Sequence, residues 1–331
     1  MDVLVLDGAA VARLLPIGAC IEVMAAAFRA LARGEAQVPP RAALLPPAGG
    51  ALAWMPAWLG GESVMGIKTI TVFGRNRGTP YPSHQGAVLL FDCAHGRPLA
   101  IVDAAAVTEI RTAAVSALAT RLLANPGAGD LALFGSGTQA SAHLAAMAAV
   151  RTLRRVRVWS RDPAHARRFA EAESARHGLP VEVAADGAAA AEGADLICTA
   201  TAARHAVLRG AWIAPGAHVN AVGASVPPFR ELDSAVASGA RIVVETRAAA
   251  LAEADDLRVP LREGAIAAAD VAELGELLEG RAAGRGSPDG VTLFKSVGLG
   301  IEDVAAAHHA HLRALEAGEG VRVPFGLPRG I

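Results

Sequence analysis

The sequence has only three cysteines, Cys20, Cys93 and Cys198, among its 331 residues. None of them lies in a CxxC pair or at the spacing from histidine that zinc sites use. Neither a disulfide framework nor a metal site is therefore expected. We expect all three to be small apolar residues buried in the protein.

The chain also lacks an excess of charge of either sign, because 31 basic side chains face 32 acidic ones, for a formal charge of -1. Without a positive field to attract phosphate backbones or anionic lipids, neither a nucleic acid nor a membrane is an expected partner. Hydrophobic residues make up 53% of the chain, but no uncharged apolar run reaches the roughly 18 residues of a membrane span. The beginning, MDVLVLDGAA, lacks the basic region of a secretory signal. We expect a cytoplasmic protein.

The length predicts two domains, since 331 residues exceed what one hydrophobic core usually holds. A strand over residues 2–6 and a helix over residues 17–31 come first. Four short β-like runs follow between Pro39 and Asp103, namely LAWMPAW, GIKTITVF, GAVLLFD and PLAIVD. Glycine, proline and asparagine separate them, which is typical of a mostly antiparallel sheet. A helix that starts near Thr108 should end at Asn125-Pro126-Gly127.

The second part of the chain, from Asp130 onward, alternates short apolar runs with helical segments. The predicted strands are LALF, VRVWS, VEV, DLICTAT and residues 217–223, 241–245 and 291–297, and the predicted helices are residues 139–150, 163–177 and 300–317. This βαβαβ rhythm predicts an α/β fold with a doubly wound parallel sheet and helices on both faces. The last helix is expected to return to the first domain.

A glycine-rich turn, Gly135-Ser136-Gly137-Thr138-Gln139-Ala140, follows the strand LALF directly and opens a helix. That context gives weight to a G-x-G-x-x-G/A match. The first glycine permits the tight turn, the second lets a pyrophosphate approach the backbone, and the alanine allows the helix to pack closely on the strand. An ordinary glycine turn is the alternative. The βαβ unit around the motif favours a Rossmann domain that binds a nicotinamide dinucleotide.

The residues after the second strand of this unit predict which dinucleotide is preferred. The strand ends in Trp159-Ser160-Arg161, where sites that prefer NAD usually carry an acidic residue for the ribose hydroxyls. A hydroxyl and a guanidinium instead suit a 2′-phosphate. We therefore predict that NADP(H) is preferred, with NAD(H) as the alternative. Asp162 is interpreted as the N-cap of the helix that begins at Pro163, rather than as a ribose contact.

Three basic residues of the first domain, Arg41, Lys68 and Arg111, lie in apolar segments. Such a charge must reach water along an exposed strand face or be matched by a buried anion. Taken by itself, Lys68 fits an exposed strand face at least as well as a functional role.

Several segments resemble the ornithine cyclodeaminase/mu-crystallin family, among them GIKTITVFGRN, GRPLAIVDAAAVTEIRTAAVSALA, LFGSGTQA and WIAPGAHVNAVGASVPPFRELD. The TxxRTAA stretch and the FKSxGxxxED stretch of TLFKSVGLGIEDVAAA are the most specific matches. The resemblance implies an α+β substrate-binding and dimerisation domain over residues 1–118 plus 310–331, and a Rossmann domain over residues 119–309. It also implies a homodimer formed through the first domain.

The resemblance assigns roles to individual positions. It implies that Arg41, Lys68 and Arg111 bind the carboxylate of a small imino or amino acid, with Lys68 also near the reacting nitrogen, and that Val297 helps to close the substrate pocket. The implied cofactor contacts are Ser83, Arg111, Thr112, Gly135, Gly137, Thr138, Gln139, Ser160, Arg161, Thr201, Val222, Gly223 and Ser296.

One position departs from the cyclising members of this family, which carry an aspartate as the acid/base where this chain has Ser225. A serine hydroxyl is a poor base near neutral pH, so the sequence more closely resembles mu-crystallin and the family's imine reductases. Ala53, beside Trp54, likewise replaces a glutamate, which predicts a more apolar pocket. We expect reduction of a cyclic ketimine carboxylate, of the pyrroline- or piperideine-2-carboxylate type, to the cyclic L-amino acid. Lys68, or water held by Ser225, would supply the proton.

Other functions stay open. One alternative is a cyclodeaminase-type lyase or an NAD(P)-dependent amino-acid dehydrogenase, which would use oxidised cofactor. Another is a non-catalytic, mu-crystallin-like ligand-binding protein, and the last is a Rossmann oxidoreductase of unrelated chemistry. His84 is interpreted as a loop residue near the pocket, and His308 and His309 as residues of a helix surface.

Overall fold

The computed structural model describes residues 2–76 and 79–326. The chain forms two compact units, unit 1 (Met1–Arg111 with Leu299–Ile331) and unit 2 (Thr112–Gly298). The divisions fall inside helix α3 (Ala104–Leu123) and just before helix α11 (Gly300–Ala317). The sequence instead places them after residues 118 and 309. The second division differs because the whole of α11 packs on strands and helices of unit 1.

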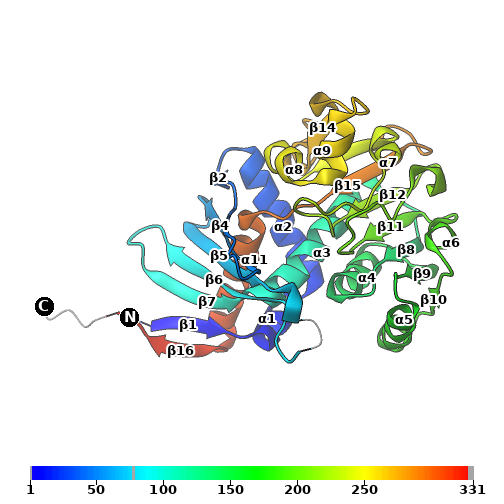
Figure 1. The fold of residues 1–331 in the computed structure, drawn as a ribbon. Helices are drawn as coiled ribbons and strands as arrows, with labels where there is room; N and C mark the ends of the chain where they lie inside the picture. The colour runs from blue at the N-terminus through cyan, green and yellow to red at the C-terminus, as the bar shows by residue number, and fades with distance from the viewer. Residues whose placement is uncertain (1, 77–78, 327–331) are drawn as a thin grey trace, which may run out of the picture. The chain divides into compact units, whose positions relative to one another are not determined.

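Unit 1 contains a mostly antiparallel sheet, as the sequence predicts (Figure 1). Its elements are β1 (Asp2–Leu6), α1 (Gly8–Leu14), α2 (Ile17–Ala32), β2 (Ala36–Gln37), β3 (Ala42–Leu44), β4 (Ala51–Leu59), β5 (Val64–Val72), the 3-10 helix η1 (Gly74–Asn76), β6 (His84–Asp92), β7 (Pro98–Asp103) and β16 (Val321–Pro324). The strand order is β16-β1-β7-β6-β5-β4-β2, and β3 also pairs with β4. Every pair is antiparallel except β1 with β7.

One face of this sheet is buried under α11. Residues on alternate positions of a strand point to opposite faces, and on β6 the buried members are Val88 and Leu90. Helix α11 lies very close to the sheet at its first residue, because a Cβ on Gly300 would be 2.6 Å from the carbonyl oxygen of Pro56. Only glycine permits this approach, which places the first turn of α11 against β4.

Unit 2 contains an eight-stranded sheet in which every neighbouring pair is parallel. Its strands are β8 (Asp130–Phe134), β9 (Arg155–Trp159), β10 (Val181–Val183), β11 (Leu196–Thr199), β12 (His218–Ala221), β13 (Ala240–Val244), β14 (Val271–Glu273) and β15 (Val291–Lys295). Its helices are α4 (Thr138–Val150), α5 (Pro163–His177), α6 (Gly187–Ala191), α7 (Ser234–Ser238), α8 (Arg247–Glu253), α9 (Asp255–Arg262), α10 (Leu274–Leu278) and the 3-10 turns η2 (Gly210–Trp212) and η3 (Ala268–Asp270). The doubly wound Rossmann-type fold is confirmed.

The strand order of unit 2, β10-β9-β8-β11-β12-β15-β13-β14, reverses between β8 and β11. From β8 the chain first builds outward through β9 and β10, and it then returns to place β11 on the other side of β8. In open α/β sheets, ligands bind beside the carboxyl ends of the strands at such a reversal. The side chains of Phe134, Ile197 and Val219, which belong to β8, β11 and β12, are fully buried and hold this part of the sheet together.

Several short elements are absent from the sequence prediction. They are α1, α7 to α10, β2, β3, β14, β16 and the 3-10 turns, none longer than eight residues. Elements of that length cover too few turns or pleats for a hydrophobic period to stand out. Within residues 2–76 and 79–326, no single helix has the length and hydropathy of a membrane span, whereas α1 and α2 taken together as a bent pair pass by length and composition.

Three expectations about single residues are wrong. His84 is the first residue of β6 and not a loop residue. Cys93 is exposed, whereas Cys20 and Cys198 are buried as expected. His308 does not lie on the surface of its helix. It is only 9% exposed, and its Nε2 lies 3.5 Å from Glu62 Oε2. The cause is that α11 packs under the sheet of unit 1 and has few surface positions.

Candidate active site

Lys68 occupies the middle of β5, between Met55 of β4 and Val88 of β6, and is 2% exposed. Its Nζ lies 2.8 Å from Asp303 Oδ2 and donates a hydrogen bond to Thr108 Oγ1 at 3.3 Å. An exposed strand face therefore does not explain this lysine. The charge is matched by a buried anion, which is the other way to accommodate a cation in an apolar strand.

Arg111, on α3, shares that anion and is 4% exposed. Its Nε donates to Asp303 Oδ1 at 2.9 Å and its Nη1 donates to Glu302 Oε2 at 2.7 Å. Both carboxylates are fully buried. We call Lys68, Arg111, Glu302 and Asp303 the four-charge cluster. With two positive and two negative side chains, its formal charge is zero.

The two acids of this cluster belong to the first turn of α11, which the close approach of Gly300 to β4 places beside the sheet. Glu302 also caps the helix, since its Oε1 accepts the backbone N–H of Leu299 at 2.7 Å. Acidic side chains are stabilised at a helix N-terminus by the helix dipole. Glu302 and Asp303 are the last two residues of the FKSxGxxxED stretch, and the sequence predicts no role for them. The signal was two adjacent acids at the start of a mostly apolar helix.

Burial changes the proton affinity of Lys68. It lowers the pKa of the amine from 10.5 to about 8, and the attraction of Asp303 opposes this shift. Desolvation disfavours the charged form of a lysine. An amine with this pKa can lose and regain a proton near neutral pH, as a general acid must.

Two other expected residues of unit 1 directly precede strands of the sheet that carries Lys68. Arg41 precedes β3, whose first residue, Ala42, pairs with Trp54 of β4. The next residue of β4, Met55, pairs with Lys68. Ser83 precedes β6, and its Oγ lies 3.0 Å from His84 Nδ1. Burial and the charge of Lys68 both lower the pKa of His84, which places this histidine in the field of the lysine.

The glycine turn of unit 2 has the geometry of a phosphate-binding turn. Gly135 adopts a φ of +115°, and a Cβ there would lie 2.4 Å from the carbonyl oxygen of Ala200, so glycine is required. A Cβ on Gly137 would meet open space, so its absence leaves the backbone accessible from outside. Gly137 caps α4 without a side-chain hydrogen bond. Thr138 and Gln139, in the first turn, present their amides where an anion is favoured. These residues fit a dinucleotide pyrophosphate.

The end of β9 places Ser160 and Arg161 beside this turn, since β9 pairs with β8. Ser160 is half-buried and Arg161 is exposed. Asp162 caps α5, because its Oδ1 accepts the N–H of Ala164 at 2.9 Å, and the interpretation of Asp162 as an N-cap is confirmed. An exposed guanidinium remains at the position where the ribose of the adenosine half binds in this fold.

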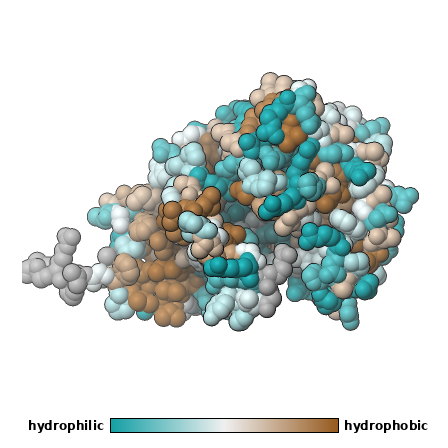
Figure 2. All heavy atoms as spheres, viewed as in Figure 1, coloured by the Kyte–Doolittle hydropathy of each residue, from teal (hydrophilic) through white to brown (hydrophobic). Residues whose placement is uncertain are grey.

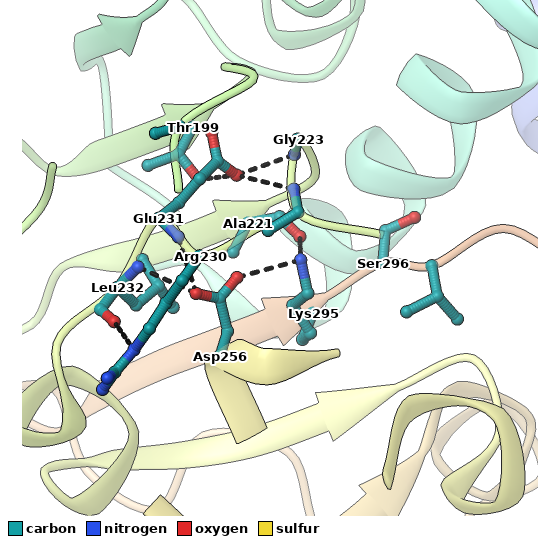
Figure 3. Close-up of polar contacts among 12 residues, drawn as sticks. Thr199, Ala221, Gly223, Arg230, Glu231, Leu232, Asp256, Lys295 and Ser296 are labelled. Carbon is teal, nitrogen blue, oxygen red and sulfur yellow. Dashed lines mark hydrogen bonds and ion pairs between the residues drawn. The ribbon is translucent and has the colours of Figure 1, made fainter. Parts of the chain in front are cut away.

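The loops after β11 and β12 carry Thr201, Val222 and Gly223, and Glu231 joins them (Figure 3). Glu231 Oε1 accepts hydrogen bonds from the N–H and the hydroxyl of Thr201 at 2.6 and 2.7 Å, and its Oε2 accepts the N–H of Gly223 at 2.7 Å. The Thr201 hydroxyl therefore donates its hydrogen bond to Glu231. Ser225, half-buried, follows in the same loop. Glu231 lies in one of the segments that resemble the family, and the sequence predicts no role for it.

A second buried carboxylate, Glu245, holds the loop after β15. Ser296 Oγ donates to Glu245 Oε1 at 2.6 Å, and the N–H of Val297 donates to Oε2 at 2.8 Å. Ser296 and Val297 are 2% and 5% exposed. Glu245 was not predicted as a site residue. It directly follows an apolar strand, and this position of an acidic residue could have indicated it.

The structure therefore groups the expected site residues in two places. In unit 1, Lys68 and Arg111 meet through Asp303, and Arg41 directly precedes β3 of the sheet that carries Lys68. In unit 2, the carboxyl ends of parallel strands carry the residues expected to contact the cofactor, which are Gly135, Gly137, Thr138, Gln139, Ser160, Arg161, Thr201, Val222, Gly223 and Ser296. Thr112 is buried on α3, directly after Arg111.

Comparison with known proteins extends these observations. The model of the ornithine cyclodeaminase/mu-crystallin family matches residues 1–318. Ketimine reductase mu-crystallin of Mus musculus is 40% identical over 259 residues, which are 78% of this chain and 79% of the mouse protein.

Two solved structures are similar along almost the whole chain. Δ1-pyrroline-2-carboxylate reductase of Thermococcus litoralis, in complex with NADH and L-proline, matches with a TM-score of 0.93 and 34% identity over 97% of this chain and 100% of that one. An archaeal alanine dehydrogenase dimer with bound NAD matches with a TM-score of 0.92 and 30% identity over 98% and 100%. The chain belongs to the ornithine cyclodeaminase/mu-crystallin family.

Proposed function

We propose that this protein reduces a cyclic ketimine carboxylate, such as pyrroline-2-carboxylate or piperideine-2-carboxylate, to the cyclic L-amino acid with a reduced nicotinamide dinucleotide. The observation that carries the proposal is the buried lysine of the four-charge cluster, whose pKa lies near 8 and which shares Asp303 with Arg111. The glycine turn of unit 2 supports dinucleotide binding. The similar proteins named as ketimine and pyrroline-2-carboxylate reductases support the substrate class.

The reaction adds a hydride and a proton across a C=N bond. When bound, the dinucleotide supplies the hydride. Asp303 forms an ion pair with the Lys68 ammonium, and Thr108 accepts a hydrogen bond from it. A further N–H of the ammonium is the donor that we assign to the imine nitrogen. Lys68 transfers this proton as general acid and is reprotonated from solvent. Arg111 and Arg41 orient the substrate carboxylate, and fixing that geometry before the reaction lowers the barrier.

The presence of Ser225 favours imine reduction over cyclodeamination. Loss of ammonia from a diamino acid requires a base to remove a proton, and a serine hydroxyl performs that step poorly without an activating partner. In a reduction, the same hydroxyl needs only to hold a water molecule or donate a hydrogen bond.

A direct assay tests the proposal. NADPH and NADH oxidation is followed by absorbance with each cyclic imine, and ammonia release is measured from L-ornithine with NAD⁺. We expect rapid imine-dependent oxidation and no ammonia. Ammonia release from ornithine would instead identify a cyclodeaminase. Tight binding of the imine without turnover would identify a ligand-binding protein.

We also propose that NADPH is preferred over NADH, because Ser160 and Arg161 follow β9 where an acidic residue would favour NADH. Replacing Arg161 by alanine should raise the KM for NADPH by about tenfold, the loss expected for one charge-assisted contact, and change the KM for NADH less than twofold. Steady-state kinetics with both cofactors measures this. Arg167→Ala, at an exposed arginine within α5, is the control. Equal effects of Arg161→Ala on the two cofactors would contradict the preference.

We further propose that the protein is a homodimer that pairs through the open face of the unit 1 sheet. Met65 of β5 is 38% exposed and Trp54 of β4 is 36% exposed. The pairing of the strands aligns one row of apolar side chains across this face, with one residue from each of six strands. The row consists of Pro56, Ile67, Leu89, Ile101, Val5 and Val321. Figure 2 shows apolar residues gathered over this part of the sheet. Large contiguous apolar patches on a protein surface commonly mark an interface with another protein.

Replacing Leu89 by arginine should convert the dimer to a monomer, because a charge at the centre of an apolar interface leaves that charge desolvated and unpaired. Light scattering after size-exclusion chromatography measures the mass. Leu312→Arg, at an exposed position of α11 (42%), should leave the mass unchanged. A Leu89→Arg protein that keeps the mass of a dimer would place the interface elsewhere.

A further inference from the structure

Three buried charged side chains lie behind the carboxyl ends of β11, β12 and β15, and the function proposed above does not use them (Figure 3). Glu231, Asp256 and Lys295 are each 0% exposed, and we call them the buried triad. Lys295 Nζ lies 3.1 Å from Asp256 Oδ2, and Asp256 Oδ1 accepts the backbone N–H of Glu231 at 2.8 Å. The triad is therefore one connected chain of polar contacts.

The triad touches the ends of three neighbouring strands. Thr199, the last residue of β11, donates its hydroxyl to Glu231 Oε2 at 2.9 Å. Ala221, the last residue of β12, accepts a hydrogen bond from Lys295 at 3.2 Å, and Lys295 itself ends β15. The loops that follow these strands are held in place by charge-assisted hydrogen bonds, which are shorter and stronger than neutral ones.

These loops belong to one half of the dinucleotide site. In a doubly wound sheet each half binds one mononucleotide. Strands β8, β9 and β10 form the half with the glycine turn, and β11, β12 and β15 lie beyond the reversal of strand order. Thr201 marks the boundary, because a Cβ built on Gly135 would lie 3.4 Å from Thr201 Cγ2. Glu231, which binds Thr201, thus lies directly behind the second half.

We propose that Glu231 is the positioning residue for the nicotinamide half of the cofactor, oriented by Lys295 through Asp256. Glu231 fixes the N–H groups of Thr201 and Gly223, and with them the two loops that border this half. A Cβ on Gly223 would lie 2.1 Å from the carbonyl oxygen of Thr201, so the loops are already in contact and depend on the same carboxylate. The inference rests on the dinucleotide binding of the proposed function and not on imine reduction.

The test compares Glu231→Gln with Asp195→Asn. Asp195 is a matched control, because its carboxylate also links loops, by accepting the N–H groups of Gly129 and Asp130 at 2.9 and 3.1 Å, but at the amino ends of the strands. Isothermal titration measures the Kd of NADH and of AMP, which is the adenosine half of the same molecule. We expect Glu231→Gln to raise the Kd of NADH about tenfold, the loss typical of hydrogen bonds to a charged group. The Kd of AMP should change less than twofold, and Asp195→Asn should leave both within twofold.

A second variant, Thr199→Val, removes a single donor to Glu231 and should raise the Kd of NADH about threefold with the same selectivity. An unchanged Kd of NADH in Glu231→Gln would overturn the inference. Equal weakening of NADH and AMP, together with a lower melting temperature, would also overturn it and show a purely structural role. Wild-type protein that binds neither NADPH nor NADH would refute both proposals, whereas protein that binds a reduced dinucleotide but reduces no imine would refute the proposed function alone.

Discussion

Replacing Lys68 by methionine is expected to lower kcat/KM for imine reduction by about a thousandfold, within the range that a general acid contributes. Methionine fills a similar volume but carries no proton. The change also leaves Asp303 with one cation fewer, although Arg111 Nε still donates to it at 2.9 Å. The initial rate of NADPH oxidation, measured over a range of imine concentrations, gives kcat/KM, and the Kd of NADPH should stay unchanged.

The double variant Lys68→Met, Asp303→Asn separates the catalytic effect from the electrostatic one. It restores the balance of charge in the cluster, so its stability should approach that of the wild type, while its activity stays low. If activity returned together with stability, Lys68 would be a structural partner of Asp303 and not the acid.

The pH profile gives a further check on Lys68. Only the protonated amine can donate, and the pKa of Lys68 is lowered to about 8. The rate of reduction should therefore be constant below about pH 7 and fall as the pH rises through 8. The Lys68→Met variant should lose this step. An unperturbed lysine would instead keep its proton to about pH 10.

Replacing Arg111 by methionine is expected to cost about 3–5 kcal/mol of unfolding free energy, the usual effect of removing one partner from a buried ion pair. Arg111 binds both Glu302 and Asp303, which are fully buried, so its removal takes one cation away from two buried carboxylates. Urea denaturation followed by circular dichroism measures the loss. This variant should therefore lose stability and activity together, unlike Lys68→Met, Asp303→Asn.

Arg111→Lys serves as the matched variant. It keeps the charge, but it lacks the separate Nε and Nη1 donors that bind Asp303 and Glu302. It should recover part of the stability and little of the activity. A loss of less than 1 kcal/mol in Arg111→Met would show that water or a shift of α11 compensates for the missing guanidinium.

Much of the fold could be predicted because the signals are local. Helix α5 begins and ends as expected, since Asp162 caps it, Pro163 suits its first position and Gly178 takes a φ of +61° at its end. The glycine turn could be recognised for a similar reason, because Gly135 and Gly137 lie two residues apart between a strand and a helix. Its close contact with Ala200 was not predictable, since that residue is distant in the sequence. Lys68 and Arg111 stood out because a charge within an apolar segment is costly wherever it lies.

The sequence by itself thus determined the parallel sheet, the dinucleotide turn and the need for an anion near each buried cation. It did not determine which carboxylate pairs with each buried cation. Arg111 and Asp303 are 192 residues apart, and they meet only because Gly300 allows α11 to pack against β4. Glu231 likewise became a binding partner of Thr201 only when β11 and β12 paired side by side. The tertiary structure decided these contacts, since the choice of partner for a buried charge depends on packing between distant segments.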